Sequence, residues 1–271
     1  HATFTHLSTI EPAVIYPCVN IEEKDDSDME KSLLEVSDAF KDADFFLSVN
    51  RFERTKNIDL AIEAFHDFKL KATTSKKIRL VVAGGYDSRV SENVLYLRHL
   101  EELCEKLDLR CFTIRGKLVV IPPSTDVLFL PSVKSSIKTA LIREADLLLY
   151  TPSFEHFGIV PVEGMLNRTV VLAVNRGGPL ESVVDYRKDT RNATGYLCEP
   201  QVAVWSKTMV DYYHLSDAEK RRLGENGHKR VQKLFLREEM TASFEKHLKA
   251  TKKKELGLVF TLLLYWKLIL A

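Results

Sequence analysis

The chain has 271 residues, of which 45% are hydrophobic and 28% are charged. This is the composition of a folded globular protein, and it excludes a collagen, a low-complexity array and a disordered tail. The 39 lysine and arginine residues balance 38 aspartate and glutamate residues, which argues against a chain-wide nucleic-acid surface. The length fits one large domain, or about one and a half domains of ~150 residues each.

Residues 1–42 differ from the rest of the chain. The sequence starts at His1, with no methionine and no signal-peptide pattern, so we expect a fragment of a longer protein. Tyr16 and Pro17 predict an extended linker, because a residue before proline avoids the helical region. The acidic stretch 22–30 is predicted to be a solvated loop. Its Asp26-Ser27-Asp28 follows no apolar strand, so no metal site is expected there.

Apolar strands alternate with amphipathic helices from residue 44 onwards. Short apolar runs predict strands at 45–50, 78–83, 112–116, 127–133, 145–150 and 169–174. Helices are expected at 58–70, 90–107, 134–144, 158–167, 202–214, 217–234 and 238–252. Near-continuous apolar strands separated by helices are typical of a parallel sheet covered on both faces. The predicted fold class is therefore α/β with a doubly wound parallel sheet.

Ligands of such sheets bind at the carboxyl ends of the strands, so the residues after each strand are candidates. Arg51 and Lys56 follow the first strand and enter a helix. An arginine fork and a compact lysine charge near a helix N-terminus suit a diphosphate. Arg54 is a competing candidate for the same role.

Paired glycines follow two other strands. Gly84 and Gly85 end the second strand, and Gly177-Gly178-Pro179 follows the strand at 169–174. Glycine there permits a tight turn and close approach of a ligand, and Pro179 suits a first helical position. The sequence has neither G-x-G-x-x-G nor a P-loop, so a nicotinamide dehydrogenase is disfavoured.

Two carboxylates eight residues apart mark the segment after the fifth strand. Glu155 is expected in a loop and Glu163 in the next helix. Eight helical steps rise about 12 Å, whereas carboxylate pairs that cleave one glycosidic bond stand ~5–9.5 Å apart. We therefore expect two binding carboxylates that reach different ends of a long ligand. The backbone N–H groups of Phe157, Gly158 and Ile159 open the helix and can hold a phosphate.

These segments together resemble a known enzyme family. The E-x7-E pair of Glu155 and Glu163, the glycine pairs and Gly195-Tyr196-Leu197-Cys198-Glu199-Pro200 are similar to retaining GT-B glycosyltransferases of the glycogen-synthase-like class. The resemblance covers about residues 13–250 and is to the C-terminal, donor-binding half. The segments 48–57 and 81–87 are closer still to mannosyltransferases that assemble dolichol-linked oligosaccharides.

The resemblance implies a role for each candidate residue. Arg51 and Lys56 would contact the donor diphosphate, and Glu155 would bind the mannose hydroxyls. Backbone groups of Phe157, Gly158 and Ile159 would hold a phosphate, Glu163 would hold the ribose, and Gly84 and Gly85 would border the donor. No bound metal or permanent cofactor is implied.

It also implies substrates, partners and a location. The donor would be GDP-mannose, and the acceptor a dolichyl-diphosphate-linked Man-GlcNAc2 oligosaccharide that receives an alpha-1,3 and then an alpha-1,6 mannose. The location would be the cytosolic face of the endoplasmic reticulum membrane, with other glycosyltransferases of the pathway as partners. Nucleic acid is not an expected partner.

The domain prediction departs from the whole GT-B fold. Residues 1–42 are interpreted as a linker or remnant of the N-terminal half, 43–250 as the donor domain and 251–271 as a basic and hydrophobic tail. The N-terminal, acceptor-binding domain is expected to be largely absent, so this chain should bind donor but transfer little mannose. The tail has about sixteen apolar residues behind Lys252-Lys253-Lys254 and is predicted to associate with a membrane.

Two alternatives stay open at this stage. One is a related GT-B transferase with another nucleotide sugar, since these motifs do not identify the base. The other is a non-catalytic donor-domain fragment that acts as a scaffold or a calcium-dependent interaction partner in a membrane complex.

Overall fold

A computed structural model of the chain describes residues 13–19, 26–74 and 76–250. Residues 1–12 and 20–25, part of the predicted linker, and the predicted membrane-associated tail 251–271 lie outside the described residues.

One parallel sheet forms the centre of the described chain. Its seven strands have the order β3-β4-β2-β1-β5-β6-β7, and every neighbouring pair is parallel. The bounds are Ala43–Val49 (β1), Lys77–Gly84 (β2), Cys111–Thr113 (β3), Val127–Pro131 (β4), Leu147–Tyr150 (β5), Val170–Val174 (β6) and Gly195–Cys198 (β7). The predicted doubly wound α/β fold is confirmed, together with six predicted strands.

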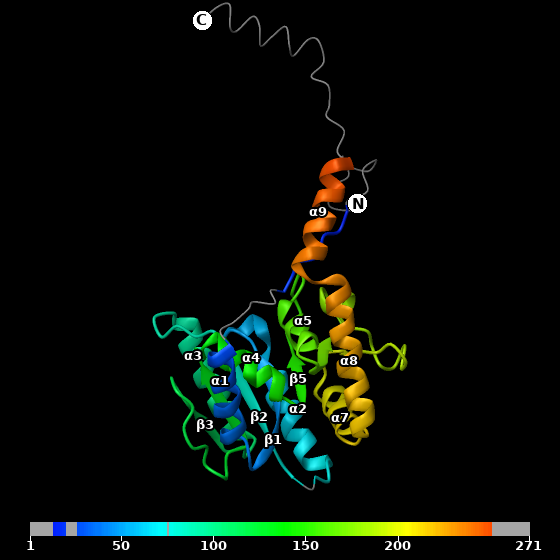
Figure 1. Ribbon diagram of the computed structural model, residues 1–271. Helices are drawn as coiled ribbons and strands as arrows, with labels where there is room; N and C mark the ends of the chain where they lie inside the picture. The colour runs from blue at the N-terminus through cyan, green and yellow to red at the C-terminus, as the bar shows by residue number, and fades with distance from the viewer. Residues whose placement is uncertain (1–12, 20–25, 75, 251–271) are drawn as a thin grey trace, which may run out of the picture.

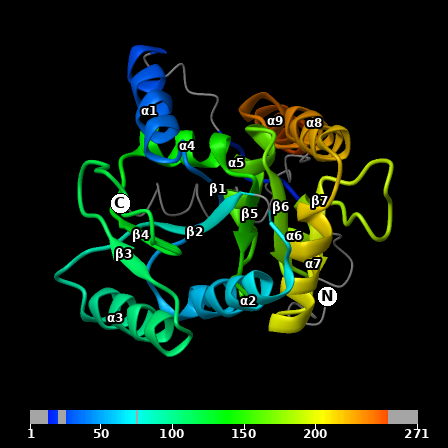
Figure 2. The same ribbon diagram turned by 90° about the horizontal axis from the view of Figure 1, so that it is seen from below.

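Helices cover both faces of the sheet (Figure 2). One layer holds α1 (Asp26–Ala39), α4 (Ser135–Glu144), α5 (Ile159–Leu166) and α8 (Asp217–Leu234). The other holds α2 (Ile58–Lys71), α3 (Ser91–Lys106) and α7 (Val202–Tyr213). Short helices η2 (Arg54–Lys56) and α6 (Pro179–Ser182) lie in loops, and α9 (Arg237–Ala250) projects from the body (Figure 1). Pro179 takes the first position of α6, as predicted.

The buried strands supply two hydrophobic cores, one on each face. Along β2, Leu80 and Val82 enter the core beneath α2, α3 and α7, whereas Val81 and Ala83 enter the core beneath α1, α4, α5 and α8. Successive side chains of a strand point to opposite faces. Continuous apolar runs are therefore required, and they are what the sequence contains.

The structure corrects the prediction for residues 26–42. The acidic stretch expected to be a loop is helical from Asp26 onwards, and α1 packs beside α4. Val36 of α1 and Phe40, which directly follows the helix, are 0% and 7% exposed in the core. The helix was not predicted because most residues around this single apolar stripe are charged or polar. This part of the predicted linker therefore belongs to the sheet domain.

Strand β7 was not among the predicted strands. It has four residues and lies at one edge of the sheet. Its outer side is covered by side chains, because the Asp185 carboxylate accepts a hydrogen bond from the Leu197 N–H (3.2 Å) and Arg187 donates to the Leu197 carbonyl. This cover blocks pairing with another strand at an otherwise open edge.

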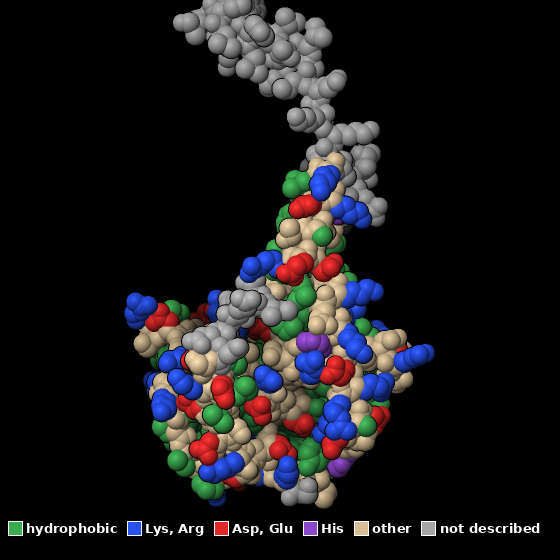
Figure 3. Space-filling view, viewed as in Figure 1, with side chains coloured by type: hydrophobic (Ala, Val, Ile, Leu, Met, Phe, Trp, Pro, Cys, Tyr) green, Lys and Arg blue, Asp and Glu red, His purple; other side chains and the backbone are tan. Residues whose placement is uncertain are grey.

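The surface carries mixed charge. Basic and acidic side chains intermingle on the face seen in Figure 3, without a broad area of one sign among the coloured residues. Over residues 13–19, 26–74 and 76–250, the structure contains no helix with the length and apolar character needed to cross a membrane.

Candidate functional site

The strand order places a crevice between β1 and β5. The chain moves from β1 to β2 on one side and later returns to β5 on the other side of β1. Such a reversal leaves a crevice at the carboxyl ends of the two strands, where doubly wound sheets bind ligands. The loops after β1 and β5 meet here, and they carry the predicted residues Arg51, Lys56 and Glu155.

Lys56 and Glu155 form an ion pair across this crevice. The Lys56 ammonium lies 2.7 Å from the Glu155 carboxylate, and their side chains are only 16% and 27% exposed. The Thr151 hydroxyl donates to the Lys56 carbonyl at 2.7 Å and ties the two loops together. Burial and the Glu155 carboxylate raise the pKa of the neighbouring Tyr150. Two residues predicted separately are thus in direct contact.

Arg51 lies nearer to solvent, at the mouth of the crevice. Its guanidinium is 2.9 Å from the Glu53 carboxylate, and its side chain is 66% exposed. A Cβ on Gly85 would lie 3.2 Å from the Arg51 side chain, so the arginine passes over this glycine. A Cβ on Gly84 would lie 2.0 Å from the Asn50 carbonyl oxygen, so only glycine allows the loops after β1 and β2 to approach this closely.

The turn before α5 packs against the second glycine pair. Gly158 occupies the N-cap of α5, and Ile159 is its first residue. The Gly178 N–H donates to the Glu155 carbonyl at 3.1 Å. The backbone of Phe157 touches Gly178, where a Cβ would lie 1.9 Å from the Phe157 carbonyl oxygen. The glycine pair therefore holds the N-terminus of α5 in place. The N–H groups of the first turn, which have no partner within the helix, lie at the carboxyl edge of the sheet.

Glu163 is held by a lysine that the sequence reasoning missed. One oxygen lies 2.7 Å from the Lys138 ammonium, and the other, Oε2, is buried without a hydrogen-bond partner in the described structure. Lys138 lies in the first turn of α4, where the helix dipole disfavours a positive charge. That unfavourable placement is the signal that could have identified it. The Oε2 atom is suited to accept a hydrogen bond from a ligand hydroxyl.

Gly178→Ala is expected to lower the free energy of unfolding by about 2 kcal/mol, because the new methyl group meets backbone rather than a movable side chain. Gly85→Ala is the matched control, since the atoms it would meet belong to the flexible Arg51 side chain. Urea unfolding of the two variants checks the prediction. Equal midpoints would contradict the close packing of the glycine pair.

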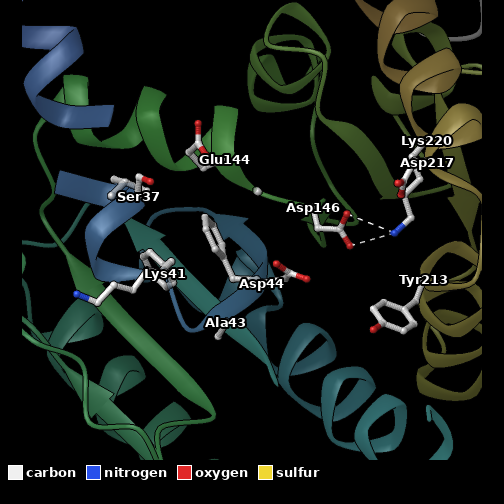
Figure 4. Close-up of a pocket in the computed structure, with 13 residues that line it drawn as sticks. Ser37, Lys41, Ala43, Asp44, Glu144, Asp146, Tyr213, Asp217 and Lys220 are labelled. Atoms are coloured by element: carbon white, nitrogen blue, oxygen red, sulfur yellow. Dashed lines mark hydrogen bonds and ion pairs between the residues drawn. The ribbon is translucent and has the colours of Figure 1, made fainter. Parts of the chain in front are cut away.

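A separate cavity of about 430 Å³ lies at the other end of the sheet. It is lined by residues of α1 and α8, the ends of α4 and α7, and the amino ends of β1 and β5. Figure 4 shows Asp146 facing Lys220 across it. The two groups are 3.5 Å apart, and burial raises the pKa of Asp146. Because the amino ends of the strands line it, this cavity is distinct from the crevice with the predicted residues. Among the described residues, no group of three or more His, Cys, Asp or Glu side chains is arranged to hold a metal.

Comparison with known families identifies the family of the chain. Residues 30–114 and 122–230 match the family described as "Glycosyl transferases group 1". The chain belongs to this family. All nine predicted site residues lie within the matched ranges, and the resemblance deduced from the sequence motifs is thereby confirmed.

Several curated relatives of the chain are named alpha-1,3/1,6-mannosyltransferase ALG2. The chain is 54% identical over 279 residues to the protein of Debaryomyces hansenii, covering 99% of this chain and 59% of the relative. It is 50% identical to the protein of Candida albicans, covering 90% of this chain and 59% of the relative. The chain thus spans about three fifths of the length of these two relatives.

Solved structures share the fold at much lower identity. Sucrose-phosphate synthase from Thermosynechococcus elongatus superposes with a TM-score of 0.68 at 20% identity, over 92% of this chain and 55% of that protein. Anabaena HepE, solved with UDP and glucose, gives 0.67 at 18% identity, over 88% of this chain and 57% of that protein.

Proposed function

We propose that this chain forms the donor-binding domain of a retaining mannosyltransferase that uses GDP-mannose. The observation that carries the proposal is the contact between Lys56 and Glu155 in the crevice between β1 and β5. In the following helix, the buried Glu163 Oε2 has no hydrogen-bond partner among the residues that the structure describes. A basic pair, a helix entrance and two separate carboxylates match the needs of a diphosphate that links a ribose to a sugar. The identity to alpha-1,3/1,6-mannosyltransferases supports mannose as the sugar.

Each group has a distinct task in the proposed reaction. Arg51 and Lys56 neutralise the negative charge that grows on the diphosphate as its bond to mannose breaks, which is electrostatic stabilisation of the transition state. The N–H groups at the start of α5 add donors fixed in place before the reaction. Glu155 accepts hydrogen bonds from mannose hydroxyls. Because Lys56 is paired with Glu155, the donor must share or displace this contact.

The proposed acceptor is a dolichyl-diphosphate-linked Man-GlcNAc2 oligosaccharide, extended by an alpha-1,3 and then an alpha-1,6 mannose. The activity in the relatives' names supports the two linkages. The proposed location is the cytosolic face of the endoplasmic reticulum membrane, with other glycosyltransferases of the same pathway as partners.

Calorimetric titration with GDP, GDP-mannose, UDP and UDP-glucose tests the donor assignment. We expect the guanine nucleotides to bind about tenfold more tightly than the uracil nucleotides, the value of one hydrogen bond to the base. Arg51→Ala should weaken GDP binding about tenfold through loss of a charge-assisted contact. Arg54→Ala is the control and should bind GDP as the unaltered chain does, because the Arg54 guanidinium lies over the Tyr96 ring, 5.6 Å from the centroid.

Two results would contradict the proposal. Tighter binding of UDP-glucose would assign the chain to another nucleotide sugar. If none of the four compounds binds, the donor-site assignment is wrong and a non-catalytic scaffold is favoured.

A further inference from the structure

Three aromatic rings from distant parts of the chain pack together next to the N-terminus of α5. Tyr16, Phe157 and Phe235, here called the aromatic triad, have ring centroids 5.9 Å (Tyr16–Phe157), 5.3 Å (Tyr16–Phe235) and 5.7 Å (Phe157–Phe235) apart. Phe157 belongs to the loop before α5, and Phe235 follows the last residue of α8. Tyr16 comes from segment 13–19, which was predicted to be an extended linker.

Segment 13–19 is fixed to the domain at the same place. The Val19 N–H donates to the Phe235 carbonyl at 2.9 Å, and Val19 forms a parallel bridge with Leu236. The Val19 side chain is 5% exposed. Tyr16 is therefore carried by a segment whose backbone is bonded to the end of α8, and its ring is directed onto Phe157.

Phe157 is held from two sides. Its carbonyl lies against the backbone of Gly178, and the Gly178 N–H binds the carbonyl of Glu155. Its ring packs on Tyr16 and Phe235. The packing of the ring and the glycine contact together set the direction in which the N–H groups after Phe157 point.

Tyr16 also lies near the element that follows the glycine pair. The side chain of Glu181 in α6 raises the pKa of the Tyr16 hydroxyl, which places the two groups close together. Arg230 donates to the carbonyls of Glu181 and Ser182 at 2.6 and 2.7 Å and lies over the Phe235 ring, 6.0 Å from the centroid. Tyr16 thus packs on the loop 155–159 through its ring, and its hydroxyl lies near the element after the glycine pair.

We infer that Tyr16 is a positioning residue for the loop 155–159, which it holds in the conformation that binds the donor diphosphate. The ring acts through Phe157. The effect on diphosphate binding rests on the proposed function, whereas the effect on the loop conformation does not.

Hydrogen exchange of the ligand-free chain tests the effect on the loop. The reporter is the Gly178 N–H, because its bond to the Glu155 carbonyl breaks when the loop moves. Tyr16→Leu should speed exchange at Gly178 about fivefold, the value of one aromatic contact, and weaken GDP binding by a similar factor. Tyr16→Phe keeps the ring, so its exchange rate at Gly178 and its GDP affinity should stay close to those of the unaltered chain. Val14→Ala, at a side chain that is 65% exposed in the same segment, is the matched control.

The amide of Val81, in the centre of β2, separates a local effect from a global one. Faster exchange at Gly178 with unchanged exchange at Val81 supports the inference. Unchanged exchange at Gly178 in Tyr16→Leu, or an equal increase at both amides, overturns it. If the unaltered chain fails to bind GDP, the proposed donor is wrong, and the exchange comparison still decides whether Tyr16 positions the loop.

Discussion

Replacement of Glu163 by glutamine is expected to weaken GDP binding about 30-fold. The buried Oε2 atom has no partner in the described structure, and the other oxygen is held by Lys138 at 2.7 Å. A ribose hydroxyl that donates to a buried carboxylate forms a charge-assisted hydrogen bond, worth about 2 kcal/mol. The amide of glutamine keeps the size of the side chain but loses the charge. Its NH2 group would also face either the ribose or the Lys138 ammonium.

Calorimetric titration of Glu163→Gln with GDP measures this effect. Glu144→Gln is the matched control, because Glu144 is an exposed residue at the C-terminal end of α4, by the cavity at the amino ends of the strands. We expect it to bind GDP as the unaltered chain does. If Glu163→Gln binds GDP with an affinity within threefold of that of the unaltered chain, Glu163 does not bind the ribose.

Replacement of Asp42 by alanine is expected to lower the free energy of unfolding by about 3 kcal/mol. Arg79 of β2 has a fully buried side chain, and its two terminal nitrogens each donate to an Asp42 oxygen at 2.8 Å. Loss of the carboxylate leaves the guanidinium buried without its counter-charge. The value lies at the low end of the range for buried pairs because the Asp42 side chain is 48% exposed and partly hydrated.

Urea unfolding measures this loss, with Asp38→Ala as the control. Asp38 pairs with Lys41 at 3.1 Å, but both side chains are at least 74% exposed. Its removal should change the free energy of unfolding by less than about 0.5 kcal/mol. Similar losses in the two variants would mean that the Arg79 pair contributes no more than a surface pair.

The same pair predicts how stability depends on pH. The hydrogen bonds from Arg79 hold the pKa of Asp42 below its usual value. The contribution to stability is therefore complete above the unfolded pKa of about 3.9, and it is lost as pH falls through the lower folded value. Asp42→Ala should consequently lose less stability between pH 5 and pH 2 than the unaltered chain.

The sequence by itself determined the parallel sheet and the edge at which the candidate site lies. Buried strands of a doubly wound sheet must be apolar on both faces, so runs such as 45–50 and 78–83 stand out without tertiary information. The polar residues at their carboxyl ends then fall at one edge of the sheet. That rule alone selected Arg51, Lys56 and Glu155.

Local patterns failed where an element is short or carries many charges. Helix α1 buries a narrow stripe that includes Val36 within an acidic segment, and β7 has only four residues at a sheet edge. In both cases the pattern within the segment is weak, because neighbours distant in sequence stabilise the element. α1 is stabilised by α4, and β7 by β6 together with Asp185 and Arg187.

Only the tertiary structure decided which residues meet. Lys56 and Glu155 are 99 residues apart in sequence and become partners because β5 returns to lie beside β1. Lys138 reaches Glu163 because α4 and α5 lie on the same face of the sheet. Strand order and helix placement depend on how crossovers pack against the whole sheet, and the periodicity of a single segment carries no information about either.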